Sequence, residues 1–569
     1  MHQSQKIFVC FLSRTFVAVL LPASLVIAGL SSPPTIDLGY STYQGISVVD
    51  PITNKTNTNF LGLRYAAPPT ADLRFSAPHP PASTSGVQIA DAEPRRCWAG
   101  TMGMQPVSPR NDAMVAVAKR SNASSGLGAR DSTEPPPFDE DCLFLNVYVP
   151  GALGSRKQNL PVVVWIHGGG YAIGSASGLF GTDIQNGNDL IREANNGVVV
   201  VVIQYRLGIF GFLPGQKVKD GGALNAGLLD QQFALQWVQK YINKFGGDPS
   251  KVTIWGQSAG AGSVIQHIIA NGGETRPSLF RAAMTSSAFL PSQYKFNDPI
   301  PENLYSETVS QTNCSSSLDT LACLRAVDVN ILQTANVNIT FSAFFGTFGI
   351  APVVDGVFII DRPSQLFKRG KLNGDIILSF TNTFEGAIFV DPTVANTTDI
   401  GNYVAQLFPT FGSKEIQAAK QQYVGMGSNF TQAVAVMTES IFVCPTYSLQ
   451  RAFKNRAFKG EFAIPPANHG DDVSYYFTSI NPSGIPSYSN AQFDASFPES
   501  FLKFALSLDP NAKFDSQDIT PHWNRWQGTN EMLFNHTEGG APDIRPIHTS
   551  SALLKRCQFW DSVSQLAGQ

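Results

Sequence analysis

The sequence has no excess of charge of either sign. Its 569 residues include 40 basic and 43 acidic side chains, which give a formal net charge of −3. Because a nucleic-acid surface needs clustered basic residues, this balance gives no footprint for a nucleic-acid partner. Charged residues make up only 15% of the chain and hydrophobic residues 43%, which is typical of a well-packed globular protein rather than a disordered one.

Near the N-terminus there is no apolar run of the length that crosses a membrane. The run at residues 15–30 contains Pro22, and a spanning helix needs about 20 apolar residues. Lys6 and Arg14 come before or at the edge of short apolar stretches, and small residues follow from Ala28. We interpret residues 1–30 as a cleaved secretory signal, with a signal anchor as the alternative. The expected location is therefore extracellular.

Cysteine is scarce, and none occurs in a metal-binding spacing. Since there is no Cys-x-x-Cys or His-rich pattern, we expect no metal site. Cys10 lies within the predicted signal. The other six are an even number in an oxidising compartment and predict three disulfides, with the pairing left open. These six are Cys97, Cys142, Cys314, Cys323, Cys444 and Cys557.

Asn-x-Ser/Thr sequons are spread along the whole chain. In a secreted protein each one is a candidate glycosylation site and a predicted surface position. They begin at Asn54, Asn122, Asn313, Asn338, Asn396, Asn429 and Asn535.

No tandem repeat or clear linker divides the chain, so we predict one domain over residues 31–569. The nearest thing to a linker is a Gly/Ser/Pro-rich stretch at 99–138, bracketed by Cys97 and Cys142. Loops of this length are usually lids or disordered segments. If the two cysteines pair, the stretch is a tethered insertion and not a domain boundary.

Short β-branched segments alternate with helical patterns. Buried parallel strands are predicted at 160–166, 198–203, 251–255, 375–380 and 460–464. The clearest helical pattern covers residues 227–245. This alternation predicts an α/β fold with a mostly parallel central sheet and helices on both faces. Reactive groups are expected at the carboxyl ends of such strands.

Ser258 lies in the pentapeptide GQSAG at 256–260, between the strand at 251–255 and a predicted helix at 261–270. A strand, a Gly-x-Ser-x-Gly turn and a helix form the nucleophile elbow of a serine hydrolase. Small neighbours allow the sharp turn, and the helix start leaves N–H groups free for a developing negative charge. Alone, the pentapeptide is a weak signal, and a serine in a surface turn is the alternative.

A nucleophilic serine needs a base and a group that orients the base. In the order Ser, acid, His of α/β hydrolases the base comes late, and we choose His469, which follows the strand at 460–464. His548 is the weaker alternative. Glu385, after the strand at 375–380, is the predicted acid. A surface histidine and a solvated turn glutamate are the competing interpretations.

Glycines also follow the strand at 160–166, in the sequence HGGG at 167–170. Bare glycine backbone can approach a reacting carbonyl closely. We therefore predict an oxyanion hole formed by the N–H groups of Gly169, Gly170 and Ala259, with a plain flexible turn as the alternative.

With these parts assembled, the chain resembles the type-B carboxylesterase/lipase family of α/β hydrolases, which includes cholinesterases and secreted fungal lipases. The resemblance runs from about residue 35 to the C-terminus. Its motifs are FLGLRYA at 60–66, EDCLFLN at 140–146, YRLGIFGFL at 205–213, NAGLLDQ at 225–231 and PVVDG at 352–356. The resemblance implies glutamate as the triad acid, which Glu385 matches, and requires no cofactor. It also implies the pairings Cys97–Cys142, Cys314–Cys323 and Cys444–Cys557, and a lid over the acyl site at 98–141.

Departures from cholinesterases concern the substrate. Those enzymes carry a glutamate before the nucleophile and two phenylalanines after the acid, where this chain has Gln257, Ile388 and Phe389. Losing a carboxylate and a ring removes part of what attracts a quaternary ammonium group, so a choline ester is not favoured. Arg64 replaces an expected proline, without a consequence that we can derive.

A group of phenylalanines precedes Pro352 in the region that shapes the acyl pocket of relatives. Such rings suit an apolar acyl or aryl group, or equally serve as core filling. The cluster contains Phe341, Phe344, Phe345 and Phe348. The predicted substrate pocket consists of Phe341, Phe345, Phe348, Ile388 and Phe389.

We therefore predict a secreted, glycosylated carboxylic-ester hydrolase that acts on neutral, apolar acyl or aryl esters through an acyl-enzyme. The first alternative is a true triacylglycerol or sterol-ester lipase, although the 98–141 segment is polar rather than an amphipathic lid helix. The second is a non-catalytic binding or adhesion protein on the same fold, which is disfavoured because every catalytic part is present. The sequence indicates neither the natural ester nor the oligomeric state.

Overall fold

The computed structural model describes residues 33–107, 135–153, 158–179, 185–393, 397–480 and 486–569. The predicted secretory signal lies outside these ranges, as do residues 108–134 of the predicted lid and the sequons at Asn122 and Asn396. The chain divides at Pro33, and the unit from Pro34 to Gln569 is the one described below.

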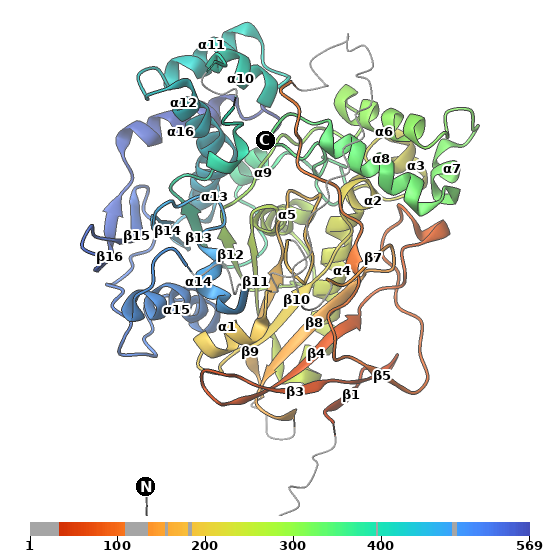
Figure 1. Cartoon of the computed structure of the whole chain (residues 1–569), viewed down its shortest axis with the longest axis vertical. Helices are drawn as coiled ribbons and strands as arrows, with labels where there is room; N and C mark the ends of the chain where they lie inside the picture. The colour runs from red at the N-terminus through yellow and green to blue at the C-terminus, as the bar shows by residue number, and fades with distance from the viewer. Residues whose placement is uncertain (1–32, 108–134, 154–157, 180–184, 394–396, 481–485) are drawn as a thin grey trace, which may run out of the picture. The chain divides into compact units, whose positions relative to one another are not determined.

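An eleven-stranded sheet runs through this unit in the order β16-β15-β14-β13-β12-β11-β9-β10-β8-β4-β3 (Figure 1). Its parallel part is formed by β9 (Leu160–Ile166), β10 (Val199–Ile203), β11 (Gly247–Gln257), β12 (Ala282–Ser286), β13 (Ile376–Asn382), β14 (Ala457–Phe462) and β15 (Asn530–His536). Antiparallel strands complete the two edges: β3 (Ile46–Val49), β4 (Thr56–Arg64), β8 (Phe144–Pro150) and β16 (Pro542–His548). The predicted mostly parallel sheet is confirmed.

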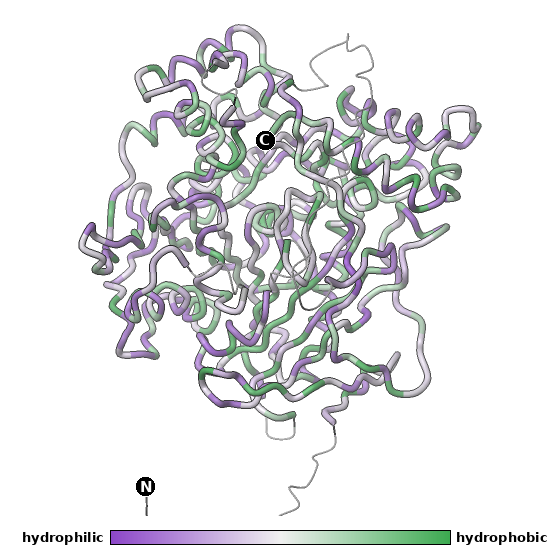
Figure 2. Tube along the Cα trace, viewed as in Figure 1, coloured by the Kyte–Doolittle hydropathy of each residue, from purple (hydrophilic) through white to green (hydrophobic). Residues whose placement is uncertain are grey.

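Helices cover both faces of the sheet. As a result, alternate residues of the central strands belong to two separate hydrophobic cores. In β9, Val162, Val164 and Ile166 face a core that includes α4 (Ala226–Tyr241) and α5 (Ala259–Gly273). Val163 and Trp165 face the other core, with α1 (Gly187–Glu193) and α15 (Ala491–Ser507). In Figure 2 the Cα trace of the central strands is coloured mostly as hydrophobic. A sheet buried on both sides explains why its strands are almost continuously apolar.

The remaining helices and small strands complete the described part of the chain. The other α-helices are α2 (Gly208–Phe212), α3 (Gln216–Gly221), α6 (Pro299–Gln311), α7 (Thr320–Ala326), α8 (Val329–Phe341), α9 (Pro363–Arg369), α10 (Ile400–Leu407), α11 (Ser413–Gln422), α12 (Asn429–Met437), α13 (Cys444–Phe453), α14 (Val473–Tyr476) and α16 (Ser551–Val563). Single turns of 3₁₀-helix occur at η1 (Ala71–Leu73), η3 (Ile242–Phe245), η4 (Ala387–Phe389) and η6 (Thr478–Ile480), and η5 (Thr438–Val443) is a π-helix. A small three-stranded sheet is formed by β1 (Thr35–Asp37), β2 (Thr42–Gln44) and β5 (Val87–Ile89), and a two-stranded one by β6 (Arg96–Cys97) and β7 (Phe138–Asp139).

Several element boundaries differ from the sequence-based expectation, among them the start of β11, which lies at Gly247 rather than at residue 251. The helix predicted over 227–245 is α-helical only to Tyr241, and its last turn is the 3₁₀-helix η3. The strand predicted at 460–464 begins earlier, at Ala457. Lys459, which is fully buried and paired with Glu531 at 2.9 Å, interrupts the apolar pattern that marks the start of this strand.

Three disulfides link the cysteines in the pairs that the resemblance implies. They are Cys97–Cys142, Cys314–Cys323 and Cys444–Cys557. Within the described ranges, no helix has the length and apolar character of a membrane span, and no group of three His, Cys, Asp or Glu residues is arranged to hold a metal ion. Of the five described sequons, Asn54, Asn313 and Asn338 are exposed, and Asn429 and Asn535 are partly exposed.

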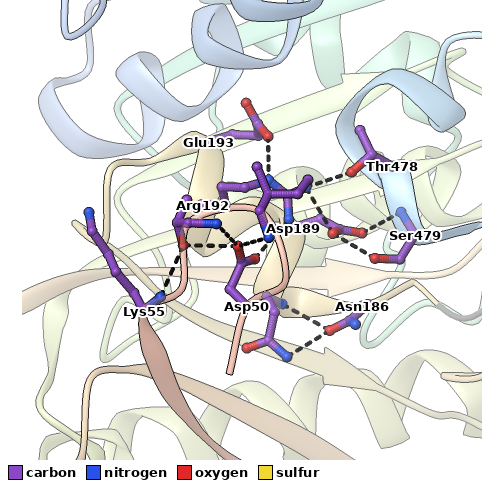
Figure 3. Close-up of polar contacts among 11 residues, drawn as sticks. Asp50, Lys55, Asn186, Asp189, Arg192, Glu193, Thr478 and Ser479 are labelled. Atoms are coloured by element: carbon purple, nitrogen blue, oxygen red, sulfur yellow. Dashed lines mark hydrogen bonds and ion pairs between the residues drawn. The ribbon is translucent and has the colours of Figure 1, made fainter. Parts of the chain in front are cut away.

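A charged network ties three distant segments together (Figure 3). The guanidinium of Arg192 in α1 lies 2.9 Å from Asp50, which follows β3, and 3.0 Å from Asp189. Glu193 lies 3.1 Å from the same group. Asp189 also accepts hydrogen bonds from the backbone N–H and the hydroxyl of Ser479 in η6. One buried cation therefore anchors the segment that follows the His469 loop.

Candidate active site

Ser258 occupies a sharp turn between β11 and α5. Its backbone has φ 58° and ψ −126°, a conformation that costs energy for any residue with a side chain. The turn is held because Ser258 N–H donates to the Ser286 carbonyl at the end of β12 (3.0 Å) and the N–H of Gly262 donates to the Ser258 carbonyl (2.8 Å). A strained strand-to-helix turn of this kind is the geometry of a nucleophile elbow.

The glycines on either side of Ser258 are required by close packing. A Cβ at Gly256 would lie 2.3 Å from the carbonyl carbon of Gly260, and a Cβ at Gly260 would lie 2.0 Å from the carbonyl oxygen of Ile166. Both obstacles are backbone atoms, which cannot move aside as a flexible side chain can. The elbow is therefore pressed directly against the end of β9.

Glu385 and His469 are brought together by the loops that follow β13 and β14. The Nδ1 atom of His469 lies 2.6 Å from Oε2 of Glu385. Glu385 is fully buried, and its other oxygen accepts from the backbone N–H of Asn382 at 2.7 Å. The backbone N–H of Phe384 donates to the carbonyl of Ala467, which fixes the two loops to each other. A buried carboxylate on Nδ1 holds the imidazole with its Nε2 facing away from the acid.

The imidazole of His469 lies between aromatic rings and the elbow. The ring centroids of Phe389 and Phe442 are 5.0 and 4.7 Å from that of His469. The Nε2 atom of His469 lies 3.2 Å from the side-chain nitrogen of Gln257, the residue before Ser258. His469 therefore has its Nε2 at the elbow, while His548, the weaker alternative, is bonded to the hydroxyl of Thr529 on the sheet edge.

Two further carboxylates next to His469 were not predicted. Burial raises the pKa of Asp472 to about 6, against hydrogen bonds from Asn382 and Tyr476 that lower it. Burial also raises the pKa of Asp471, which accepts from the backbone N–H of Asn468. The only sequence signal was the pair of aspartates after His469-Gly470, which by itself is also typical of a surface turn.

The glycine loop lies beside Ser258. A Cβ at Gly168 would lie 2.9 Å from the Cβ of Ser258, and one at Gly170 would lie 2.1 Å from the Phe348 ring. Gly169 and Gly170 have φ of 103° and 62°, which favour glycine. Ala259 is the first residue of α5, so its N–H has no partner within the helix. The structure thus places Gly168 of the glycine loop beside Ser258, and Ala259 directly after it at the start of α5; the oxyanion hole of Gly169, Gly170 and Ala259 stays a prediction.

His167 supports this loop rather than taking part in proton transfer. Its Nδ1 is bonded to the carbonyl oxygen of Gly168 at 2.9 Å, and its ring stacks on Tyr205. The Tyr205 hydroxyl donates to the carbonyl of His167. Burial lowers the pKa of His167 to about 4, so the ring is neutral at physiological pH.

An apolar pocket opens behind the Phe348 ring. Its empty space is about 1000 Å³, part of which is open to solvent. Among the described residues, none of those lining it is charged. The side chains that line it come from distant segments and include Phe289, Leu304, Phe348, Leu407, Met437 and Ile441.

Only one of the five predicted pocket residues, Phe348, lines this cavity. Phe341 and Ile388 are 45% and 48% exposed, and Phe345 is partly exposed. Phe389 is buried and contacts His469 and Phe348 instead. Most of the lining was missed because residues such as Met437 and Ile441 sit in η5 and its neighbouring helix, where nothing local marks them as pocket residues.

The sheet, the elbow after β11 and the loops after β13 and β14 define the α/β-hydrolase class. A family model described as "Carboxylesterase family" matches residues 32–560. Carboxylesterase patB of Penicillium expansum is 30% identical over 93% of this chain and 96% of its own length. A secreted lipase of Arthroderma benhamiae is 31% identical over 74% of this chain and 83% of its own. The crystal structure of Aspergillus niger EstA superposes with a TM-score of 0.79 at 28% identity, covering 94% of this chain and 99% of that one. The chain belongs to the carboxylesterase family.

Proposed function

We propose that this protein is a secreted serine carboxylic-ester hydrolase in which Ser258, His469 and Glu385 form the catalytic triad. The observation that carries the proposal is the 2.6 Å contact between His469 Nδ1 and the buried Glu385, which leaves Nε2 at the elbow that holds Ser258. In this arrangement the acid fixes the tautomer in which Nε2 has its lone pair available.

The reaction follows from these positions. Ser258 Oγ attacks the ester carbonyl while Nε2 of His469 accepts its proton, and Glu385 stabilises the imidazolium that forms. The N–H groups of Gly169, Gly170 and Ala259 bind the oxyanion, and each such donor contributes about 3–4 kcal/mol to lowering the barrier. His469 then protonates the leaving alcohol, and water repeats the cycle on the acyl-enzyme.

The pocket supports neutral, apolar acyl or aryl groups as the substrate class. Its lining has no charged residue in the described part of the chain. Gln257, beside the nucleophile, adds no negative charge that would attract a cation. Neutral esters are therefore preferred to esters of a cationic alcohol such as choline.

Secretion is supported by the apolar segment at 15–30 and by the secreted lipase of Arthroderma benhamiae among the relatives. Expression in a secreting host tests it. We expect the protein in the medium with a new N-terminus near residues 28–32, and retention of the full-length chain in cell membranes contradicts it.

The activity test is hydrolysis of p-nitrophenyl esters of increasing acyl length, with Ser258→Ala as the control. A choline ester is compared with its neutral 3,3-dimethylbutyl isostere. We expect hydrolysis that depends on Ser258 and a higher kcat/KM for the neutral isostere. Equal activity of Ser258→Ala contradicts the triad, and a preference for the choline ester contradicts the substrate class.

Exposed apolar side chains favour a lipase as the second candidate. Phe384 and Ile388, which flank Glu385 and Phe389, are 52% and 48% exposed, and Met104 and Phe341 are each 45% exposed. The N–H of Met104 donates to the Phe341 carbonyl, so these two lie together. Rates measured below and above substrate solubility distinguish the two, because a jump only above solubility indicates action at a lipid surface.

A further inference from the structure

The last residues of the sequence pack between two segments that border the candidate active site. Gln569 is only 3% exposed, and Ala567 is fully buried. The hydroxyl of Ser292, in the loop after β12, donates to the Ala567 carbonyl (2.7 Å). The hydroxyl of Ser364 in α9 donates to the main-chain oxygen of Gln569 (2.5 Å), and Figure 1 marks this end of the chain beside α9.

The side-chain amide of Gln569 joins the loop after β12 to the π-helix η5. Its nitrogen lies 2.7 Å from the carbonyl oxygen of Leu290 in the loop and 2.7 Å from that of Ser440 in η5. Since both neighbours are acceptors, the amide nitrogen uses both of its protons there. The N–H of Leu290 in turn donates to the Ile441 carbonyl (3.0 Å), so a closed ring of hydrogen bonds connects the loop and the helix.

A proline explains why η5 needs donors from outside the helix. The N–H of residue 445 would donate to the carbonyl of Ile441 in α-helical register, or to that of Ser440 in π-helical register. That residue is Pro445, which has no N–H. The two carbonyls accept instead from Leu290 and Gln569. Gln569 therefore supplies a donor that the helix cannot provide at this point.

The η5 helix touches two parts of the candidate triad. The Thr438 hydroxyl accepts from the N–H of Gly386, the residue after Glu385, at 2.8 Å. The ring centroid of Phe442 lies 4.7 Å from that of His469. Movement of η5 would therefore reach both the acid loop and the base.

The loop after β12 touches the third part, the nucleophile. At its start the Ser286 carbonyl accepts from the N–H of Ser258 (3.0 Å). Further along, Phe289 lines the apolar pocket together with Ile441 of η5. The two segments that Gln569 joins thus carry the supports of the nucleophile and the base, and each contributes one side chain to the pocket wall.

We infer that Gln569 is a positioning residue that holds the nucleophile side of the site against the base side. This rests on the proposed function for the reaction itself. The amide fixes the loop that supports Ser258 relative to the helix that carries Phe442 and Ile441. Without the amide, buried carbonyls lose their donor, which is costly, and the pocket wall and the ring contact with His469 loosen together.

The test uses Gln569→Met, which keeps the length of the side chain but has no amide. Gln565→Met is the matched control, because it makes the same change at an exposed side chain in the same segment. Ser364→Ala is a milder second variant, since it removes the hydroxyl that donates to the main chain of Gln569 and leaves the amide in place.

Two measurements are made on each variant. The first is kcat/KM for a short and a long p-nitrophenyl ester, because the ratio of the two values does not depend on how much of the protein is folded. The second is hydrogen exchange of residues 287–293 and 438–443, followed by mass spectrometry, which reports on the loop and on η5 without any substrate.

We expect Gln569→Met to lower the ratio of long to short ester at least about threefold, because the wall that the long chain needs is no longer fixed. Both segments should exchange faster, Ser364→Ala should show smaller changes in the same direction, and Gln565→Met should match wild type. If Gln569→Met does not fold, Ser364→Ala decides by the same criteria.

A wild-type ratio in Gln569→Met overturns the inference even if Tm falls, because the residue is then only structural. Wild-type exchange in both segments overturns it as well. If the wild-type protein hydrolyses no ester, the proposed function fails, while the exchange measurement still decides whether Gln569 joins the loop to η5.

Discussion

Replacing Arg192 by methionine removes the cation at the centre of the network in Figure 3 while keeping most of the side-chain volume. The side chains of Arg192, Asp50 and Asp189 are only 10%, 3% and 1% exposed. Breaking a buried ion pair by removing one partner costs about 3–5 kcal/mol, because the remaining charges are left uncompensated. Three carboxylates surround this guanidinium, so we expect a loss in that range.

The size of the unit converts this loss into a melting temperature. Unfolding entropy of about 2.1 cal/mol/K per residue gives about 1.1 kcal/mol/K for the residues from Pro34 to Gln569. A loss of about 3–5 kcal/mol then lowers Tm by about 3–5 °C. The assay is differential scanning fluorimetry, with Arg545→Met as the control. Arg545 is 57% exposed and paired with Asp543, so its loss is expected to change Tm by less than about 1 °C.

The pH dependence gives a second, independent check. Burial raises the pKa of Glu193 to about 7, and the charge of Arg192 opposes that rise. The pKa of Asp50 is lowered overall, because burial, which raises it, is outweighed by hydrogen bonds from Thr53 and Arg192. Without the guanidinium both pKa values rise, so the folded variant takes up protons and recovers stability as the pH falls. We expect the Tm difference from wild type to be larger at pH 8 than at pH 5. The reasoning is refuted if Arg192→Met lowers Tm by less than about 1 °C at pH 8. It is also refuted if the Tm difference between wild type and variant at pH 5 is equal to or larger than the difference at pH 8.

Three other changes test the site. Gly260→Ala places a Cβ about 2.0 Å from the Ile166 carbonyl and should lower kcat at least about 100-fold in protein that still folds by circular dichroism; near-normal kcat contradicts the required close packing. Phe348→Ala opens the wall of the pocket and should raise the kcat/KM ratio of long to short acyl esters about tenfold, whereas an unchanged ratio separates this pocket from acyl binding. The pKa of Asp472 in the folded protein is raised to about 6, so its contribution to stability is complete below its unfolded pKa and is lost as the pH rises through 6. In urea unfolding, Asp472→Asn should therefore gain stability relative to wild type as the pH rises from 4 to 8. A stability difference that stays constant over this range argues against the raised pKa.

Much of the fold was predictable because the central strands are buried on both faces. The apolar run at 160–166 coincides with β9, and 198–203 contains β10. Strand β12 was not predicted, since its sequence at 282–286, AAMTS, consists of small and polar residues. The start of β14 was missed because a lysine can occupy a buried strand when Glu531 pairs with it, and that partner is distant in sequence.

The candidate site also has a part that the sequence predicts and a part that it does not. Ser258, His469 and Glu385 each follow a strand, and turn glycines mark the elbow and the oxyanion loop locally. The pocket is built from side chains that meet only in the folded chain, so the exposed Phe341 and Ile388 could not be told from Phe289 or Met437 by sequence. The bond between Gln257 and His469 likewise joins residues more than two hundred positions apart.

The central claim is that Ser258 is the nucleophile activated by His469 and Glu385. The most direct measurement is the reaction of the intact, folded protein with a fluorophosphonate probe, followed by mass-spectrometric mapping of the adduct. We predict one adduct, on Ser258, which is absent in Ser258→Ala and forms much more slowly in His469→Ala and Glu385→Gln. A folded protein that remains unlabelled, or an adduct on another serine, contradicts the account.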